Sequence, residues 1–192
     1  MNINPYLPTI EYPGVKIWDN LIDDLFLLNL DQESDLYNWE YTNIANTKSF
    51  PNFEKGTHKF WAVNFLIDKI PSKILDLYNF LNENIIQSSY KVKSVHLNGQ
   101  SMGQNGTVHL DSLPNSNEKT LMVFINFKWQ KEWEGEFQLL EEYNNNAKII
   151  ENIKYIPGRI VLFDGSIPHR GLAPTEPYVL RKSLVFRLIK NE

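Results

Sequence analysis

The chain has 192 residues, of which 42% are hydrophobic and 22% are charged. This is the composition of an ordinary globular protein, and it excludes a disordered, collagen-like or coiled-coil chain. The absence of cysteine from the sequence also excludes disulfide scaffolds, thiolate metal sites and cysteine nucleophiles. Any metal site must therefore use carboxylates and the four histidines, which are His58, His96, His109 and His169.

The net charge of −4 argues against a broad nucleic-acid-binding surface. We expect a cytoplasmic protein without a membrane segment. The first residues show no signal-peptide pattern, and no apolar run approaches the roughly 20 residues that span a bilayer. The excess of Asn, Ile and Lys over Ala and Arg indicates an AT-rich coding sequence. A viral protein that acts in the host cytoplasm is therefore an alternative. All four arginines of the sequence lie beyond residue 158, which calls for an explanation.

Residues 1–90 are predicted to be mostly helical and to support the rest of the chain. Apolar residues recur at helical spacing over residues 18–28, with aspartates between them, which predicts an acidic, solvated helix. Pro71 suits the first turn of a second helix. The apolar face of this second helix holds Ile74, Leu77, Tyr78, Leu81 and Ile85. Residues 41–56 are predicted to form an irregular loop.

After residue 90 the pattern changes to short β-rich segments separated by turn signals, and seven of the nine glycines lie between Gly99 and Gly171. Strands are predicted over residues 91–100, 107–111, 119–127, 136–141, 149–156, 159–163 and 180–189. Such a series predicts a closed or double-sheet antiparallel architecture. Because helices come first and strands afterwards, we predict an α+β, mainly β, fold in one domain over residues 1–192.

One histidine and one aspartate stand two residues apart in the predicted strand 107–111. Because side chains at i and i+2 of a strand point to the same face, His109 and Asp111 would project into one space. His169 is a candidate third ligand, since it follows a strongly apolar strand and a turn containing Gly and Pro that can direct it inward. Two histidines and one carboxylate, with the remaining metal positions open, form the ligand set of non-haem Fe(II) oxygenases.

Arg181 and Ser183 lie on the last predicted strand, where the same alternation places them on one face. A guanidinium and a hydroxyl side by side can hold one carboxylate. Taken alone, a structural ion pair with a buried acidic residue explains Arg181 at least as well.

The order His109-x-Asp111, His169 and Arg181-x-Ser183 resembles the Fe(II)/2-oxoglutarate-dependent dioxygenases, and most of all the prolyl-4-hydroxylase-like branch with its short single-domain bacterial and phage members. The resemblance covers residues 91–189 and implies a double-stranded β-helix, or jelly-roll, core. It implies that the two histidines and the aspartate bind Fe(II), which the keto acid end of 2-oxoglutarate chelates. It also implies that Arg181 and Ser183 hold the distal carboxylate, with O₂ as a reactant and ascorbate as an optional reductant.

Residues 95–100 resemble the strand that precedes the first metal ligands in this family and lends residues to the cosubstrate pocket. By alternation His96, Asn98 and Gln100 share a face, and the resemblance assigns them to cofactor binding. The sequence departs from the family here, since His96 stands where the branch often has a tyrosine and the following spacer is longer. Trp129 and Trp133 resemble the aromatics of a family loop, and we expect them to be core or rim residues rather than ligands.

Four further residues have other or undecided roles. His58 is expected to be a surface or hydrogen-bonded residue rather than a ligand, because it has no partner at ligand spacing. Arg170 suits a substrate contact or a surface ion pair equally well. Arg187 shares the face of Arg181, as a second anion contact or a structural partner, whereas Lys182 points to the opposite face.

The predicted domain thus has helical support in residues 1–90 and a jelly-roll core with the site in residues 91–190. The resemblance implies an enzyme that hydroxylates an unactivated C–H bond and releases succinate and CO₂ from 2-oxoglutarate. Its prime substrate would be a peptidyl prolyl or other side chain, an amino acid or a small molecule. Two alternatives are an AlkB-like nucleic-acid demethylase, which the spacing of Arg181 and Arg187 suggests, and a jelly-roll module that binds without turnover. The missing basic stripe disfavours the first alternative, and the intact order of the motifs disfavours the second.

Overall fold

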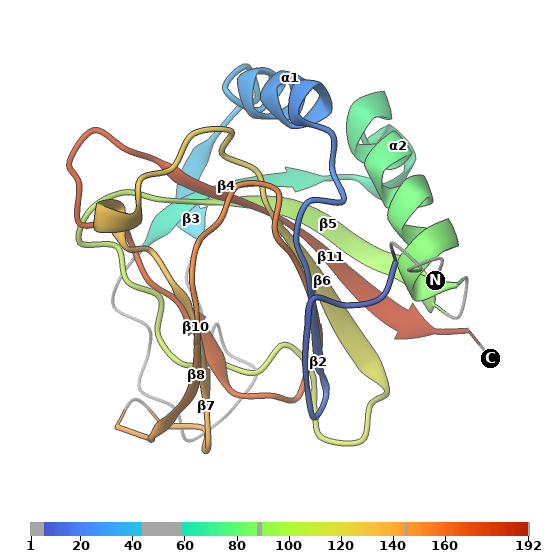
Figure 1. The fold of residues 1–192 in the computed structure, drawn as a ribbon, viewed down its shortest axis with the longest axis vertical. Coiled ribbons are helices and arrows are strands. Elements are labelled where there is room, and N and C mark those ends of the chain that lie inside the picture. The colour runs from blue at the N-terminus through green and yellow to red at the C-terminus, as the bar shows by residue number, and fades with distance from the viewer. Residues whose placement is uncertain (1–5, 44–58, 88–89, 145, 192) are drawn as a thin grey trace.

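The computed structural model describes residues 6–43, 59–87, 90–144 and 146–191. In these residues a large antiparallel sheet contains β1 (Ile10–Tyr12), β2 (Val15–Trp18), β3 (Glu40–Asn43), β4 (Phe60–Phe65), β5 (Tyr90–Gln100), β6 (Glu118–Phe124), β9 (Ile160–Asp164) and β11 (Arg181–Lys190). A small antiparallel sheet contains β7 (Phe137–Leu140), β8 (Ile149–Ile153) and β10 (His169–Gly171). The large sheet is ordered β1-β2-β9-β6-β11-β5-β4-β3 and the small sheet β10-β7-β8. These two sheets form the jelly-roll, and both helices lie beside the large sheet, away from the small one (Figure 1).

The two helices are α1 (Asp24–Ser34) and α2 (Ser72–Leu81), and α2 continues into a π-helical turn, η2 (Asn82–Ile86). Asp23 caps α1, since its Oδ1 accepts hydrogen bonds from the backbone N–H groups of Leu25 and Phe26 at 2.9 and 3.1 Å. Short 3₁₀ turns, η1 (Ile67–Lys69) and η3 (Lys131–Trp133), connect other elements. Among the described residues, none of the helices has the length and apolar character needed to cross a bilayer.

Side-chain alternation on the central strands β6 and β11 builds two separate cores. One face packs against α1 and α2 through Leu121, Val123, Leu184, Phe186 and Leu188. The other face packs against the small sheet through Met122, Phe124 and Val185. Each fully buried Leu or Phe stabilises the fold by roughly 1.5–3 kcal/mol, so both packed faces contribute strongly. The polar residues that interrupt the second face are the ones that build the site.

The predicted mainly β, jelly-roll fold is confirmed, and six of the seven predicted strands match β5, β6, β7, β8, β9 and β11 with shifted ends. The prediction of a strand over residues 107–111 was wrong, because only an isolated bridge between His109 and His169 forms there. The mostly helical prediction for residues 1–90 was wrong in part, since β1 to β4 lie in this region and join the large sheet. Trp18 belongs to β2 rather than to the first helix, and Pro71 precedes α2 instead of starting it. The predicted loop over residues 41–56 overlaps β3, and its part beyond residue 43 lies outside the described residues.

A buried lysine ties α1 to the rear face of β11. Lys182 is 3% exposed, and its Nζ donates to Asp35 Oδ1 at 2.7 Å, to Ser34 Oγ at 2.8 Å and to the carbonyl oxygen of Asp31 at 3.0 Å. It also forms an ion pair of 2.5 Å with Asp31 Oδ1. The other carboxylate oxygen of Asp31 accepts a hydrogen bond of 2.9 Å from the backbone N–H of Phe127. The ammonium group thus has partners for all three of its protons, which a buried charge requires.

Lys182→Met is expected to lower the free energy of unfolding by about 3 kcal/mol, because it leaves the partly buried Asp31 without its counter-charge. Urea unfolding followed by circular dichroism measures the change. Lys73→Met is the matched control, because Lys73 on α2 pairs with Glu33 on α1 at a more exposed position. This variant should lose less than about 1 kcal/mol of unfolding free energy. Equal losses in the two variants would contradict the anchoring role of Lys182.

Candidate active site

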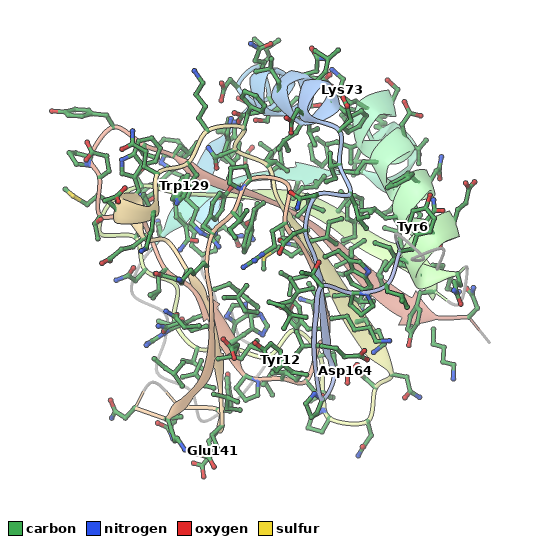
Figure 2. The ribbon with its side chains drawn as sticks, viewed as in Figure 1. Tyr6, Tyr12, Lys73, Trp129, Glu141 and Asp164 are labelled. Carbon is green, nitrogen blue, oxygen red and sulfur yellow. The ribbon has the colours of Figure 1, made fainter. Side chains whose placement is uncertain are left out.

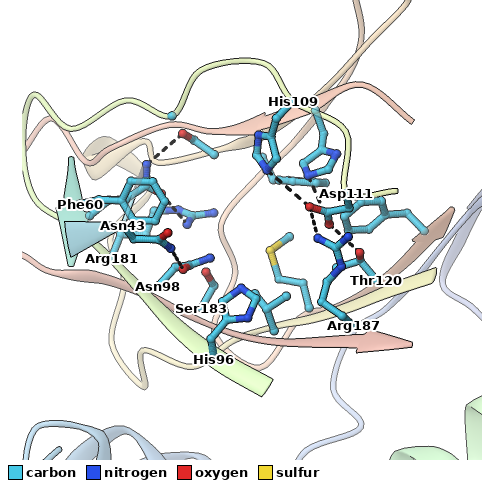
Figure 3. Close-up of a pocket in the computed structure, with 18 of the residues that line it drawn as sticks. Asn43, Phe60, His96, Asn98, His109, Asp111, Thr120, Arg181, Ser183 and Arg187 are labelled. Atoms are coloured by element: carbon cyan, nitrogen blue, oxygen red, sulfur yellow. Dashed lines mark hydrogen bonds and ion pairs between the residues drawn. The ribbon is translucent and has the colours of Figure 1, made fainter. Parts of the chain in front are cut away.

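A cavity of about 320 Å³ opens between the large and small sheets. All of the residues that the sequence assigned to the site line this cavity: His96, Asn98, Gln100, His109, Asp111, His169, Arg181 and Ser183. Figure 3 shows His109 and Asp111 at one end and Arg181 at the other. His58, the remaining histidine, lies outside the described residues.

Two histidines and one aspartate form the only group of three or more potential metal-ligating His, Asp or Glu side chains found within the described part of the chain. One ligand atom from each lies within 4.8 Å of the other two. His109 Nε2 is 3.6 Å from Asp111 Oδ1, and His169 Nε2 is 3.5 Å from Asp111 Oδ2. The side chains come together although residues 107–111 are not a strand. His109 and His169 exchange two backbone hydrogen bonds, of 2.9 and 3.0 Å, and the N–H of Asp111 donates to Gly165 O at 2.7 Å.

The two imidazoles are oriented by the same local device. His109 Nδ1 lies 3.0 Å from Thr107 O, and His169 Nδ1 lies 2.8 Å from Ile167 O, in each case the carbonyl two residues upstream. A carbonyl can only accept, so each Nδ1 carries a proton, and in the neutral form of the ring Nε2 then presents its lone pair. This is the tautomer that a metal-binding histidine needs, with its other nitrogen fixed by a hydrogen bond.

The carboxylate of Asp111 is held from two neighbouring strands. Thr120 Oγ1 on β6 donates to Asp111 Oδ2 at 2.6 Å, and Arg187 Nη1 on β11 forms a short ion pair with Oδ1. Thr120 and Arg187 are direct partners in the β6–β11 register, so the sheet itself places the two donors side by side. Arg187 was expected to be a second anion contact or a structural partner, and the structure shows it as an ion-pair partner of Asp111.

Charge and burial set the protonation states of this group. Burial alone would raise the pKa of Asp111, but the neighbouring His169 and Arg187 outweigh it and hold this pKa well below its usual value. Burial lowers the pKa of His109 to about 4 and that of His96 to about 4. At neutral pH Asp111 is therefore a carboxylate and His109 a neutral imidazole, which are the protonation states in which these side chains bind a divalent metal.

Arg181 is buried, with 1% of its surface exposed, and only part of its guanidinium is used within the protein. Nε donates to Gly135 O at 2.7 Å and Nη1 donates to Gln100 Oε1 at 3.1 Å, whereas the buried Nη2 has no hydrogen-bond partner. Gly135 has φ +77°, and a Cβ there would approach Arg181 Cδ to 3.2 Å, so this contact requires glycine. Burial lowers the pKa of Arg181 to about 10, which leaves the group charged at neutral pH. A buried cationic N–H without an acceptor is costly, and it marks the place of an anionic ligand.

Three polar side chains near this guanidinium are Ser183, Asn98 and Gln100, and two of them already form hydrogen bonds within the protein. Ser183 stands two residues along β11 on the same face, and its register partner across β5 is Asn98. The Asn98 side chain accepts a hydrogen bond of 3.0 Å from Asn43 Nδ2. The Gln100 amide nitrogen donates to Gln104 O and Gly171 O at 2.8 and 3.0 Å, so this side chain braces Arg181.

Sequence reasoning missed several residues of the site, among them Thr120, Asn43 and Phe60. Their positions follow from the strand order and register, which no local pattern shows. Arg170 does not line the described cavity, and its Nε donates to Gln138 Oε1 at 2.8 Å across the β10–β7 pair.

Residues 95–186, which include the whole His-Asp-His group and Arg181, match the sequence model of the 2OG-Fe(II) oxygenase superfamily. The match places residues 95–186 of the chain in this superfamily. As the order of its motifs predicted, it is an oxygenase of the 2-oxoglutarate-dependent class, whose members use Fe(II) and 2-oxoglutarate. No curated protein matches this oxygenase.

Solved structures with the same fold include prolyl hydroxylases, as the predicted branch implied. A Pseudomonas putida prolyl-4-hydroxylase has a TM-score of 0.63 and 14% identity, over 93% of this oxygenase and 94% of that chain. A prolyl hydroxylase from Trichoplax adhaerens, in complex with a hypoxia-inducible factor peptide, has a TM-score of 0.55 and 18% identity, over 92% and 84%. The carbocyclase SnoK from nogalamycin biosynthesis has a TM-score of 0.63 and 12% identity, over 92% and 79%. At these identities the similarity establishes a shared fold.

Proposed function

We propose that this oxygenase hydroxylates an unactivated C–H bond, with His109, Asp111 and His169 as the Fe(II) ligands and Arg181 and Ser183 as the anchor of 2-oxoglutarate. The observation that carries the proposal is the buried, unpartnered Nη2 of Arg181 in the same cavity as a His-Asp-His group. A dicarboxylate that reaches from the metal to this guanidinium satisfies both ends of the site.

The residues present fit both groups. Two imidazole nitrogens and one carboxylate are the donor set of non-haem Fe(II) sites with open positions, and the protonated Nδ1 atoms leave Nε2 free to bind. A carboxylate at Arg181 would receive a charge-assisted hydrogen bond from Nη2, with the Ser183 hydroxyl beside it.

When bound, the metal supplies the oxidative chemistry in which 2-oxoglutarate and O₂ give succinate, CO₂ and an oxidised substrate. The protein fixes the geometry for that chemistry. Thr120 and Arg187 orient the carboxylate of Asp111, and Gln100 and Gly135 orient the guanidinium of Arg181. We assign His96 and Asn98 to the wall of the 2-oxoglutarate pocket, where the neutral His96 offers a hydrogen bond without a competing charge.

For the prime substrate we propose a peptidyl prolyl or other side chain, or a small molecule. Among proteins of this fold, the Trichoplax enzyme is in complex with a peptide, while SnoK is a carbocyclase of nogalamycin biosynthesis. Succinate release over a panel of peptides, amino acids and small metabolites, with Fe(II), ascorbate and 2-oxoglutarate, tests the proposal. Methylated single-stranded DNA in the same panel tests the demethylase alternative. Turnover of 2-oxoglutarate that persists in a metal-free preparation would contradict the proposed Fe(II)-dependent reaction.

Thr120→Val is expected to weaken Mn(II) or Fe(II) binding by roughly tenfold, because outer hydrogen-bond partners of metal ligands typically contribute 10–100-fold. Valine keeps the shape of threonine and removes only the hydrogen bond to Asp111 Oδ2. Anaerobic Fe(II) titration, or Mn(II) titration followed by electron paramagnetic resonance, measures the affinity. Thr175→Val, at an exposed hydroxyl that bonds Glu132 O, is the control and should bind as the wild type does. An unchanged affinity in Thr120→Val would refute the orienting role.

A further inference from the structure

Two buried polar side chains that take no part in the site as described lie directly behind Arg181. Tyr155 is 5% exposed and follows β8, and Asn126 is 8% exposed and follows β6. The Tyr155 hydroxyl lies 2.6 Å from Asn126 Oδ1, and it accepts a hydrogen bond of 3.2 Å from the Asn126 backbone N–H. Burial raises the pKa of Tyr155, so its hydroxyl stays protonated and remains a donor.

This pair bonds backbone groups on both sides of Arg181, the first residue of β11. Asn126 Nδ2 donates to Leu180 O at 2.9 Å, and Asn126 Oδ1 accepts from the backbone N–H of Lys182 at 2.7 Å. The Tyr155 hydroxyl lies 2.5 Å from Lys182 O. Two side chains from the segments after β6 and β8 thus fix three backbone groups that flank Arg181.

The ring of Tyr155 also contacts the Arg181 side chain itself. Arg181 Cζ lies 5.0 Å from the ring centroid of Tyr155 and 5.2 Å from that of Phe124, within the range of cation–π contact. Tyr155 stacks on Phe124 with centroids 4.4 Å apart, and Trp129, labelled in Figure 2, packs on Tyr155 at 4.2 Å. The ring stack leaves the long arginine side chain few alternative rotamers.

We propose that Asn126 and Tyr155 are positioning residues that set the affinity for 2-oxoglutarate by holding Arg181 in its ligand-binding orientation. The inference rests on the proposed function, in which Arg181 anchors the distal carboxylate. An arginine held in place before the ligand arrives loses less conformational entropy on binding, so affinity falls when its supports are removed.

The test uses Tyr155→Phe, which keeps the ring and removes only the hydroxyl. Both acceptors retain a second donor, since Asn126 Oδ1 keeps the Lys182 N–H and Lys182 O keeps the Ile125 N–H, so the fold should survive. Titration calorimetry with Mn(II) in place of Fe(II) measures the metal and 2-oxoglutarate affinities separately and without turnover. The expected result is a roughly five- to tenfold weaker 2-oxoglutarate Kd, with the Mn(II) Kd within about twofold of the wild type.

Two further variants separate the possible outcomes. Tyr155→Leu removes the ring as well and should weaken 2-oxoglutarate binding further, whereas Tyr78→Phe, which removes a hydroxyl bonded to Tyr90 O at 3.4 Å, should bind normally. A wild-type 2-oxoglutarate Kd in Tyr155→Phe overturns the inference, and so does an equal loss of Mn(II) and 2-oxoglutarate affinity, which indicates general destabilisation. If the wild type itself does not bind 2-oxoglutarate, the proposed function fails instead.

Discussion

His109→Ala is expected to weaken Fe(II) binding by more than about 100-fold, beyond the range seen for outer partners of metal ligands, and to abolish 2-oxoglutarate turnover. The imidazole offers one of the three ligand atoms of the proposed site, and the two that remain would not hold a divalent metal with comparable affinity. The side chain is 24% exposed, so its truncation leaves the core intact and the loss reflects the metal site. Anaerobic Fe(II) titration and succinate release measure the two effects.

His58→Ala is the matched control for this experiment, because that histidine belongs to none of the motifs. It should bind Fe(II) as the wild type does. Retention of near-native Fe(II) affinity by His109→Ala would mean that this histidine is purely structural, and the metal assignment would then be abandoned.

Arg181→Met is expected to weaken 2-oxoglutarate binding by roughly 100-fold or more, since it removes both the charge and the free Nη2 donor, and charge-assisted hydrogen bonds contribute about 1.5–3 kcal/mol each. Methionine fills similar volume in a buried position, so the free energy of unfolding without ligand should change little or rise. Calorimetry in the presence of Mn(II) gives the Kd, and urea unfolding gives the stability.

Arg170→Met is the control for the loss of an arginine, because its guanidinium bonds Gln138 and does not line the described cavity. It should leave the 2-oxoglutarate Kd within about twofold, a change of less than 0.5 kcal/mol. An intact Kd in Arg181→Met would place the cosubstrate anchor elsewhere, and the proposed roles of Asn126 and Tyr155 would fall with it.

The second half of the fold was predictable because its strands carry their own signal. On β11 the alternation of polar and apolar residues separates Arg181 and Ser183 from Leu184 and Phe186, and the structure follows this separation throughout the strand. The predicted opposite orientation of Lys182 also holds, since it faces α1.

The first ninety residues were harder to predict because their strands depend on distant partners. β2 pairs with β9, and β4 pairs with β5, over separations that no local window contains. Trp18 fits a helical periodicity with the residues after it, yet the pairing with Ile160 places it in a strand. Tertiary pairing overrode local propensity here, as it often does for short strands.

The candidate site likewise contains residues that the sequence predicted and residues that it did not. Its motif residues were found by spacing and order, and the structure brings them to one cavity. Their hydrogen-bond partners come from elsewhere in the chain: Thr120 meets Arg187 through the β6–β11 register, and Asn126 and Tyr155 lie in the segments that follow β6 and β8. The clustering of the arginines in the sequence does not distinguish the ligand-site candidate Arg181 from Arg159. The guanidinium of Arg159 forms a bidentate ion pair with Asp19.

The alternation on β11 restricts how this protein can change in length. A single residue inserted or deleted within β11, directly after Arg181, would reverse the side chains that follow it, bringing Leu184 to the cavity and burying Ser183 against α1. The loops before this strand tolerate such changes more easily than the strand does. Natural variants and engineered substrate pockets of this enzyme should therefore differ in loop length, while the spacing within residues 181–187 stays fixed.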